Sequence, residues 1–240
     1  MTTNMITVKQ LTYKRNRKVI LDDLNLDLVQ GHFIGLLGAN GAGKTTLMQL
    51  LNGVATTFHG TIQIGSSESI VERKQLSSFS ESLNGVNPNR TLKQIATYYA
   101  DMYLDFSEAE FANFLKTFDL DSHQKLAALS KGNRKKLIAA LTLARQAQLY
   151  LLDEPFEGID SMTSKRIISN LIAWKPAAAT VIISDHHVSD VANVLDEVVI
   201  IKDKHVVAQK NAEELREETG MSIENYSSIF KSSATMITNS

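Results

Sequence analysis

Residues 38–45, Gly-Ala-Asn-Gly-Ala-Gly-Lys-Thr, match the glycine-rich pattern G-x-x-x-x-G-K-[ST], which binds phosphate. Glycines let the backbone curl so that several N–H groups converge on one anion. A lysine at this place reaches the β- and γ-phosphates, and the hydroxyl that follows it is a Mg²⁺ ligand. The residues predicted to bind a nucleotide are Asn40, Gly41, Ala42, Gly43, Lys44, Thr45 and Thr46.

Two adjacent carboxylates, Asp153 and Glu154, directly follow the apolar run 149–152. Such a run is typical of a buried strand, and ligands of open α/β sheets bind at the carboxyl ends of strands. There Asp153 would reach a Mg²⁺ ion together with Thr45, and Glu154 would polarise a water for attack on the γ-phosphate. The alternative is a buried strand that ends in two solvated acids.

A serine at a predicted helix start, Ser130, offers a second place for an anion. Its hydroxyl and the exposed N–H groups of the first turn, near Gly132, are suited to bind phosphate. One chain already has a phosphate loop, so a second anion site makes sense if it completes the ATP site of another subunit. The alternative is an ordinary helix cap.

These residues must be positioned by alternating strands and helices, a pattern that predicts a parallel sheet with covered faces. Buried strands are predicted at 33–37, 149–152, 180–184 and 197–201, with helices at 44–52 and 164–174. Earlier strands predicted at 5–8, 19–28 and 60–65 suggest a small antiparallel sheet. Tyr13 is expected on the loop between the first two of these.

A helical insert is predicted at about 88–145, because 91–103 and 107–118 carry apolar residues at helical spacing. Its Tyr and Phe residues are interpreted as the core of that insert. We predict one domain over 1–210, followed at 211–240 by a C-terminal helix and a flexible tail.

Composition excludes several classes of protein. The 240 residues are 43% hydrophobic and 21% charged, which is typical of a globular protein with a real core. The formal net charge of −1 provides no electrostatic footprint for nucleic acid. The absence of cysteine excludes disulfides and fits a reducing compartment. We find no signal peptide and no apolar run that would span a membrane, so we expect a cytoplasmic protein.

Several motifs together resemble one family, the ABC ATPases. Leu-Ser-Lys-Gly-Asn at 129–133 is similar to the family's Leu-Ser-Gly-Gly-Gln signature, and it stands before Asp153-Glu154-Pro155. Gly-Ile-Asp at 158–160 is similar to the D-loop, and Ser-Asp-His at 184–186 to the switch-histidine segment. With the phosphate loop, the motifs keep the family's order and span roughly residues 8 to 205.

The resemblance implies a P-loop NTPase fold of ABC ATPase type and a head-to-tail dimer with two Mg-ATP between phosphate loop and signature. It implies that Ser130, Gly132 and Asp160 act at the shared ATP sites, and that His186 contacts the γ-phosphate. His187 is the competitor for that role. Tyr13 resembles the aromatic residue on which adenine stacks.

The chain departs from the family pattern at three places. The glutamine expected between the two subdomains is replaced at Phe-Ser-Glu 79–81, so Glu81 is the candidate Mg²⁺ ligand and Gln75 a weaker one. A carboxylate there should slow or retune turnover. Lys131 and Asn133 replace a glycine and a glutamine in the signature. Asp-Lys-His at 203–205 lacks the usual glycine of a late turn.

We therefore predict an ATP-hydrolysing subunit of an ABC transporter, on the inner face of the cell membrane, driving export through separately encoded membrane subunits. Its partner would be an identical or related ATPase subunit, and no nucleic acid is expected. By analogy, the Ser-Lys-Gly signature and short insert resemble drug, peptide or bacteriocin-immunity exporters. The alternatives are a non-transport ABC ATPase acting on ribosomes or DNA and a slow regulatory ATP-binding subunit.

Overall fold

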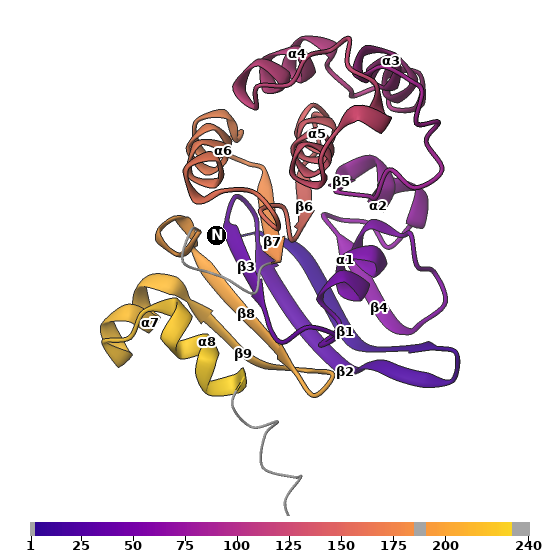
Figure 1. Cartoon of the computed structure of the whole chain (residues 1–240). Helices are drawn as coiled ribbons and strands as arrows, with labels where there is room; N and C mark the ends of the chain where they lie inside the picture. The colour runs from indigo at the N-terminus through magenta and orange to yellow at the C-terminus, as the bar shows by residue number, and fades with distance from the viewer. Residues whose placement is uncertain (1–2, 185–190, 232–240) are drawn as a thin grey trace, which may run out of the picture.

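The computed structural model describes residues 3–184 and 191–231, and within these ranges the strands form two sheets. A three-stranded antiparallel sheet has the order β2-β1-β4, and a six-stranded sheet has the order β5-β6-β7-β3-β8-β9. The strands are β1 (Asn4–Arg15), β2 (Lys18–Val29), β3 (Phe33–Leu37), β4 (His59–Ile64), β5 (Ser77–Phe79), β6 (Leu149–Asp153), β7 (Thr180–Ser184), β8 (Glu197–Lys202) and β9 (His205–Asn211). The predicted α/β class, with a mixed sheet and a small antiparallel one, is confirmed (Figure 1).

The helices fall into a group around the six-stranded sheet and a group in the insert. They are α1 (Lys44–Asn52), α2 (Ile70–Leu76), α3 (Leu92–Met102), α4 (Glu108–Thr117), α5 (Lys131–Leu143), α6 (Ser161–Trp174), α7 (Ala212–Thr219) and α8 (Ile223–Lys231), with short 3₁₀ turns at Leu126–Ala128 and Ala192–Val194. In Figure 1, α3 and α4 lie at the opposite end of the molecule from the antiparallel sheet. Thr91 caps α3 in a reciprocal pair with Gln94, and Ser107 caps α4.

The six-stranded sheet brings several strand ends to one edge. β5, β6, β7, β3 and β8 run parallel, and β9 is an antiparallel edge strand. Ser184, the last residue of β7, lies opposite both Leu36 of β3 and Asp153 of β6. The loop that follows β3 therefore emerges beside Asp153, at the edge where α/β sheets bind ligands.

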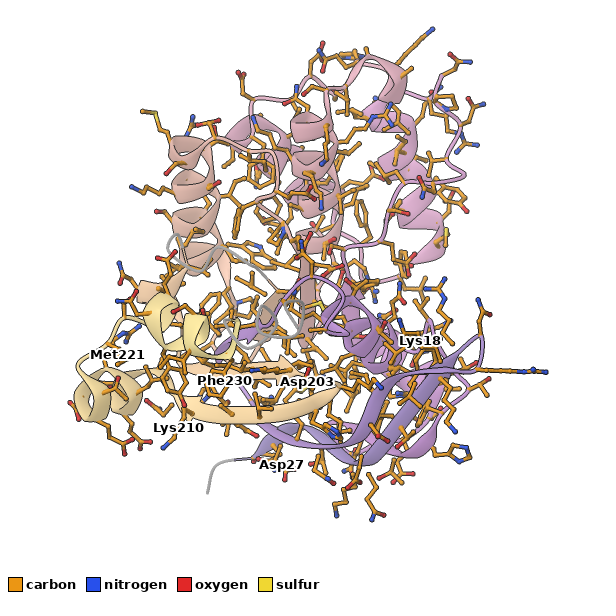
Figure 2. The ribbon with its side chains drawn as sticks, turned by 60° about the horizontal axis from the view of Figure 1, so that its bottom comes forward. Lys18, Asp27, Asp203, Lys210, Met221 and Phe230 are labelled. Carbon is orange, nitrogen blue, oxygen red and sulfur yellow. The ribbon has the colours of Figure 1, made fainter. Side chains whose placement is uncertain are left out.

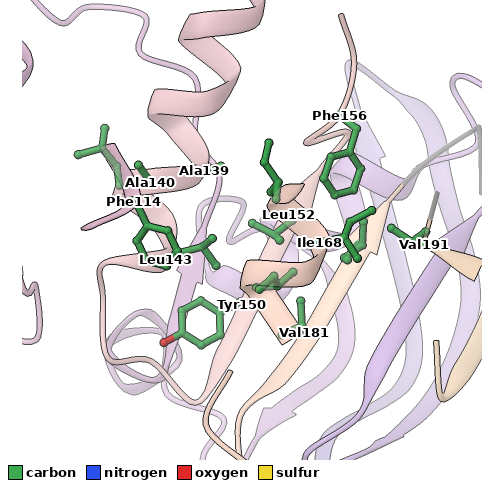
Figure 3. Packing of buried hydrophobic residues seen from close by; sticks show 14 of the residues in the cluster. Phe114, Ala139, Ala140, Leu143, Tyr150, Leu152, Phe156, Ile168, Val181 and Val191 are labelled. Carbon is green, nitrogen blue, oxygen red and sulfur yellow. The ribbon is translucent and has the colours of Figure 1, made fainter. Parts of the chain in front are cut away.

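Strand β6 is buried on both faces, which explains its continuous apolar sequence. Leu149 and Leu151 pack into a cluster shared with α1 and the antiparallel sheet. Tyr150 and Leu152 pack into a second cluster, between the sheet and the helices α5 and α6 (Figure 3). The two clusters hold Asp153 at the end of a strand that has little freedom to move.

Arg145 joins the insert to the six-stranded sheet. Its guanidinium donates to both carboxylate oxygens of Asp105 at 2.9 Å and to the Ser77 carbonyl at 2.8 Å. It also lies over the ring of Tyr103, at 4.2 Å from the centroid. Because the buried charge is paired and hydrogen-bonded, this contact fixes one corner of the insert against the strand β5.

Tyr13 lies in a strand, which corrects the expectation that it lies on a loop. β1 extends to Arg15, and Tyr13 is paired with Leu21 of β2. The turn between these strands consists only of Asn16 (φ 50°) and Arg17 (φ 67°). This two-residue left-handed turn is compatible with the strand twist, so the hairpin continues further than its apolar residues suggest.

The C-terminal segment contains two helices, where the sequence predicted one helix followed by a loose tail. Ala212 and Leu215 of α7 and Ile223 of α8 are buried in the cluster that contains Tyr150. The second helix was missed although Ile223, Tyr226, Ile229 and Phe230 recur at helical spacing, a signal that the sequence did offer. The stretch predicted to be loose, from Ser232 onward, lies outside the described residues.

Candidate functional site

The phosphate loop, residues 38–43, is held in a tight curve between β3 and α1. Gly38 (φ 150°) and Gly43 (φ 109°) have backbone conformations that L side chains rarely adopt. A Cβ at Gly38 would lie 2.4 Å from the Ile201 carbonyl oxygen, and a Cβ at Gly43 would lie 2.6 Å from Leu21. Glycine is therefore required at both positions, and the N–H groups that begin α1 remain able to face an anion.

The side chain of Lys44 lies inside this loop. Its ammonium donates to the carbonyl oxygens of Gly38, at 2.8 Å, and Ala39, at 3.1 Å. The residue is buried, although it carries a full positive charge. Burial of a lysine is unusual, and the contacts to the loop carbonyls hold this cation where an anion in the loop would meet it.

Thr45 and Asp153 are in direct contact, although they are far apart in the sequence. Thr45 Oγ1 donates to Asp153 Oδ2 at 2.7 Å, and Ser184 Oγ donates to Asp153 Oδ1 at 2.5 Å. The backbone N–H of Asp153 donates to Ser80 Oγ at 2.8 Å. The carboxylate is thus fixed beside a hydroxyl, and oxygen donors of this kind suit Mg²⁺.

Glu81 lies near this pair, whereas Gln75 does not. A pocket of about 490 Å³ is lined by Thr45, Asp153 and the exposed Glu81, together with Ser80 and Lys135. Gln75 belongs to α2 and lines a separate groove. Of the two candidates for the missing glutamine, Glu81 is the one that shares a pocket with the residues suited to Mg²⁺. No group of three or more His, Cys, Asp or Glu suited to a metal occurs in the part of the chain that the structure describes.

Glu154 follows β6 in a left-handed conformation, with φ of 46°. Its N–H donates to the carbonyl oxygen and to the hydroxyl of Ser184, both at 3.1 Å. A left-handed glutamate is unfavourable by about 1–3 kcal/mol, so the surrounding contacts must hold it. Such strain is concentrated at functional sites, and it turns the chain sharply where β6 ends.

Ser130 and Asp160 each cap a helix. The Ser130 hydroxyl accepts from the Asn133 N–H at 3.2 Å at the start of α5. Asp160 Oδ1 accepts from the Thr163 N–H at 2.9 Å at the start of α6, and its contacts with Thr163 lower the pKa of this exposed carboxyl. A Cβ at Gly132 would lie 2.9 Å from the Gly158 carbonyl oxygen, so these two segments are in close contact.

The structure does not bring Ser130 to the phosphate loop of its own chain. Ser130 is exposed, and it lines neither the pocket that contains Thr45 nor a second hollow beside the loop. That hollow, of about 360 Å³, is lined by the loop from Gly38 to Ala42, by residues 18–20 and by Asp203 and Phe230, which Figure 2 labels.

Tyr13 does not line this hollow. It packs, half-buried, against the cluster of the antiparallel sheet. Thr46 lies in the first turn of α1 and is half-buried. His186 and His187 lie outside the described residues.

Three residues that contact Asp153 or Glu154 were not predicted from the sequence. Ser80 and Ser184 bind Asp153, and Lys135 donates to the Glu154 carbonyl at 3.1 Å. Ser184 alone had a signal in the sequence, because it ends a buried strand with a polar side chain, but the strand that lies beside it was not known. Ser80 directly follows the short strand β5, and Lys135 lies on the helix α5. The sequence does not specify what either element packs against.

Comparison with known proteins gives a consistent result. A family model described as ABC transporter matches residues 21–157. AlbC of Bacillus subtilis (strain 168), by name an ABC transporter ATP-binding protein, is 30% identical over 205 residues, covering 81% of this chain and 85% of AlbC. The aliphatic sulfonates import ATP-binding protein SsuB 2 of Pseudomonas syringae pv. syringae (strain B728a) is 28% identical over 203 residues, covering 84% of this chain and 70% of SsuB 2.

The fold is also found among solved structures. One described as the ATP binding subunit of an ABC transporter superposes with a TM-score of 0.82 at 22% identity, covering 95% of this chain and 99% of that one. Within the described part of the chain, no helix has both the length and the hydrophobicity needed to cross a membrane.

Proposed function

This chain belongs to the ABC transporter family, as an ATP-binding subunit whose ATPase activity is coupled to transport, and we propose how its residues bind and hydrolyse ATP. Two copies, or one copy and a related subunit, enclose two ATP molecules and drive export through membrane subunits. The observation that carries the proposal is the 2.7 Å hydrogen bond between Thr45 and Asp153. It joins the phosphate loop to the acidic end of β6.

Lys44, Thr45 and Asp153 hold the nucleotide in this proposal. The N–H groups of residues 40–46 and the Lys44 ammonium bind the β- and γ-phosphates. Thr45 and Asp153, with Glu81 nearby, would hold Mg²⁺, which when bound neutralises phosphate charge. The paired hydroxyl and carboxylate oxygens support this donor set.

Glu154 orients the attacking water and accepts its proton. Its sharp backbone turn at the end of β6 supports this role, because it sets the residue just beyond Asp153. His186 is proposed to contact the γ-phosphate, and Tyr13 to stack against adenine. Turnover by the Glu154→Gln variant at the parental rate would overturn the first assignment.

Ser130 serves the ATP of a second subunit. Its hydroxyl is exposed at the N-terminus of α5, and it lines neither hollow beside its own phosphate loop. Gly132 is in close contact with Gly158, two residues before Asp160, and Gly132 and Asp160 are proposed to face the second subunit with Ser130.

The membrane subunits dock at the junction between the insert and the helix α2. A groove of about 530 Å³ beside Arg145 is lined by Val71, Met102 and Leu104, which are apolar yet 65%, 52% and 104% exposed. Exposed apolar side chains gathered in one groove indicate a binding surface for another protein. A cytoplasmic segment of a permease is the partner that the family supplies.

The Ser-Lys-Gly signature and the short insert support export. The similarity to SsuB 2, which is by name an import protein, makes import the alternative to test. Inside-out vesicles containing the chain and its permease test this with the dye Hoechst 33342. ATP-dependent accumulation of the dye supports export, and ATP-dependent loss from loaded vesicles overturns it.

Two measurements test the whole proposal. The purified chain should release phosphate from ATP only when Mg²⁺ is present. The chain should sediment with membranes only when a permease is co-expressed, and Leu104→Asp should weaken that sedimentation. Membrane-independent association with ribosomes or DNA would instead support a non-transport ATPase.

A second candidate is a regulatory subunit that binds ATP but hydrolyses it slowly. The observation that favours it is Glu81, whose carboxylate lines the pocket containing Thr45 and Asp153. Steady-state phosphate release distinguishes the two, because a regulatory subunit would bind ATP with normal affinity and turn over at a small fraction of the rate.

A further inference from the structure

The start of α5 is clamped to the loop that follows β6. We call residues 154–158 the acidic loop. Lys131 Nζ lies 2.6 Å from Glu157 Oε1, and Lys135 Nζ lies 3.6 Å from Glu157 Oε2. Lys131 and Lys135 are four residues apart, so both reach the loop from one face of the helix. The missing Cβ of Gly132 lets the two backbones approach.

The charges of this contact compensate one another. A helix N-terminus carries a partial positive charge, so two lysines in the first turns of α5 are unfavourable there. The Glu157 carboxylate offsets them, and the hydrogen bond from Lys131 is the main reason that the pKa of Glu157 lies below its usual range. Lys131 and Glu157 are substantially exposed, however, and such pairs contribute little to global stability.

Lys135 makes a second contact that Lys131 does not. Its ammonium donates to the Glu154 carbonyl at 3.1 Å, an oxygen that also accepts from the Glu157 N–H at 3.3 Å. The Lys135 side chain is only 23% exposed, and it lines the pocket that contains Thr45 and Asp153. Lys135 is therefore held between the backbone carbonyl of Glu154 and the carboxylate of Glu157.

We propose that Lys135 is a positioning residue, which holds Glu154 in its left-handed conformation and thereby aims the Glu154 carboxylate at the attacking water. This inference rests on the proposed role of Glu154. Without the ammonium, the Glu154 carbonyl loses its charged hydrogen-bond donor, and the unfavourable φ is compensated less well. The acidic loop then samples other conformations, and the carboxylate is misaligned for part of the time.

The same contact connects the two half-sites of one subunit. Ser130 caps the helix that carries Lys135, and Glu154 begins the loop that Lys135 holds. A movement of α5 against a neighbouring subunit's ATP would therefore be passed to the chain's own Glu154.

Lys135→Met tests the proposal, because it keeps the length of the side chain and removes the ammonium. Lys135→Arg should restore the contact, and Lys136→Met is the matched control, because Lys136 donates to the Phe118 carbonyl instead. We expect Lys135→Met to lower kcat about tenfold, a loss typical of a misaligned catalytic group, with KM for ATP unchanged within about twofold. Lys135→Arg should recover most of the rate.

Amide hydrogen exchange without nucleotide gives an independent readout. Lys135→Met should speed exchange in a peptide spanning the acidic loop, while exchange in β6 and the melting temperature stay at parental values. Unchanged exchange in the loop, a parental kcat, or equal losses in Lys136→Met would each overturn the proposal. Glu154→Gln separates the two proposals. If this variant hydrolyses ATP at the parental rate while Lys135→Met still speeds exchange in the acidic loop, the catalytic role of Glu154 is refuted, but the stabilisation of the loop by Lys135 is supported.

Discussion

The ammonium of Lys44 lies within the phosphate loop, where it donates to the Gly38 and Ala39 carbonyls. A charge-assisted hydrogen bond from this group to a phosphate is worth roughly 1.5–3 kcal/mol. Lys44→Ala should therefore lower ATP affinity about tenfold or more by isothermal titration calorimetry. Lys9→Ala, a change at an exposed lysine of β1, is the control and should bind normally. Unchanged affinity in Lys44→Ala would refute the assignment of the loop.

Glu81 adds a negative charge to the pocket that contains Thr45 and Asp153. Repulsion between charges a few ångströms apart is worth about 1 kcal/mol even in water, which corresponds to roughly fivefold in a rate or equilibrium constant. Glu81→Gln should therefore raise kcat/KM for Mg-ATP several-fold in a phosphate-release assay. Glu72→Gln, at an exposed position of α2, should have no effect. A fall in activity with a higher Mg²⁺ requirement would show that the carboxylate itself is needed.

The contact between Thr45 and Asp153 could be anticipated from the sequence, because a glycine loop and an acidic residue that both follow buried strands meet at one sheet edge. The hydroxyls of Ser80 and Ser184 could not be assigned to Asp153 in the same way. Their positions depend on the strand order β5-β6-β7, which places Ser184 opposite Asp153. Strand order is decided by long-range packing, which a local pattern does not report.

Among the elements, the buried strands of the six-stranded sheet and the helix after the phosphate loop were predicted, whereas β5, α2, β9 and α8 were missed. The helix that begins at Lys44 matches its predicted bounds, and the strand that ends at Asp153 is one residue longer than predicted. The three-residue strand β5 and the seven-residue helix α2 were missed, because so few residues carry no readable period. The strand β9 was missed because it is a largely exposed edge strand with a polar sequence.

The β1–β2 hairpin contains an avoidable strain at Arg17, which has a φ of 67°. Asn-Gly is the favoured pair for a two-residue hairpin turn, and a non-glycine residue in this region costs about 1 kcal/mol. Arg17→Gly removes this strain but adds conformational freedom to the unfolded chain, so the free energy of unfolding, measured by urea titration, should rise by about 0.5 kcal/mol at most. Arg15→Gly is the control within β1 and should destabilise the protein. Destabilisation by both would show that the Arg17 side chain has a stabilising contact.

Glu197 at the start of β8 carries a buried carboxyl. Burial raises its pKa, although Gln209 donates to Oε1 at 2.6 Å and His32 lies 3.8 Å from Oε2. A raised pKa in the folded state means that this group's stabilising contribution is present below its unfolded pKa and is lost as the pH rises through the folded value.

Glu197→Gln, which imitates the protonated carboxyl, should therefore gain stability relative to the wild type as the pH rises from 5 to 8. Urea titrations at several pH values measure this difference. Glu68→Gln, an exposed change, should track the wild type at every pH. A difference that stays constant with pH would show that Glu197 titrates alike in the folded and unfolded states.

In the whole molecule, the two regions that we propose to contact ATP are separate from each other. One is the phosphate loop with Thr45 and Asp153, and the other is the exposed Ser130 at the start of α5. Neither hollow beside the phosphate loop is lined by Ser130. A second subunit that supplies its own Ser130 would complete the first site, and the symmetry of such a pair completes both at once.

Glu154→Gln should trap this pair, because it blocks the step that would dissolve it while leaving nucleotide binding intact. Gel filtration in the presence of Mg-ATP should give a dimer for Glu154→Gln and a monomer without nucleotide. Adding Ser130→Glu should return the double variant to a monomer, since a carboxylate at the signature would repel the neighbour's phosphates, while ATP affinity stays unchanged. If the double variant still dimerises with ATP, Ser130 does not face a neighbour's nucleotide, and the two partial sites would have to be explained within one chain.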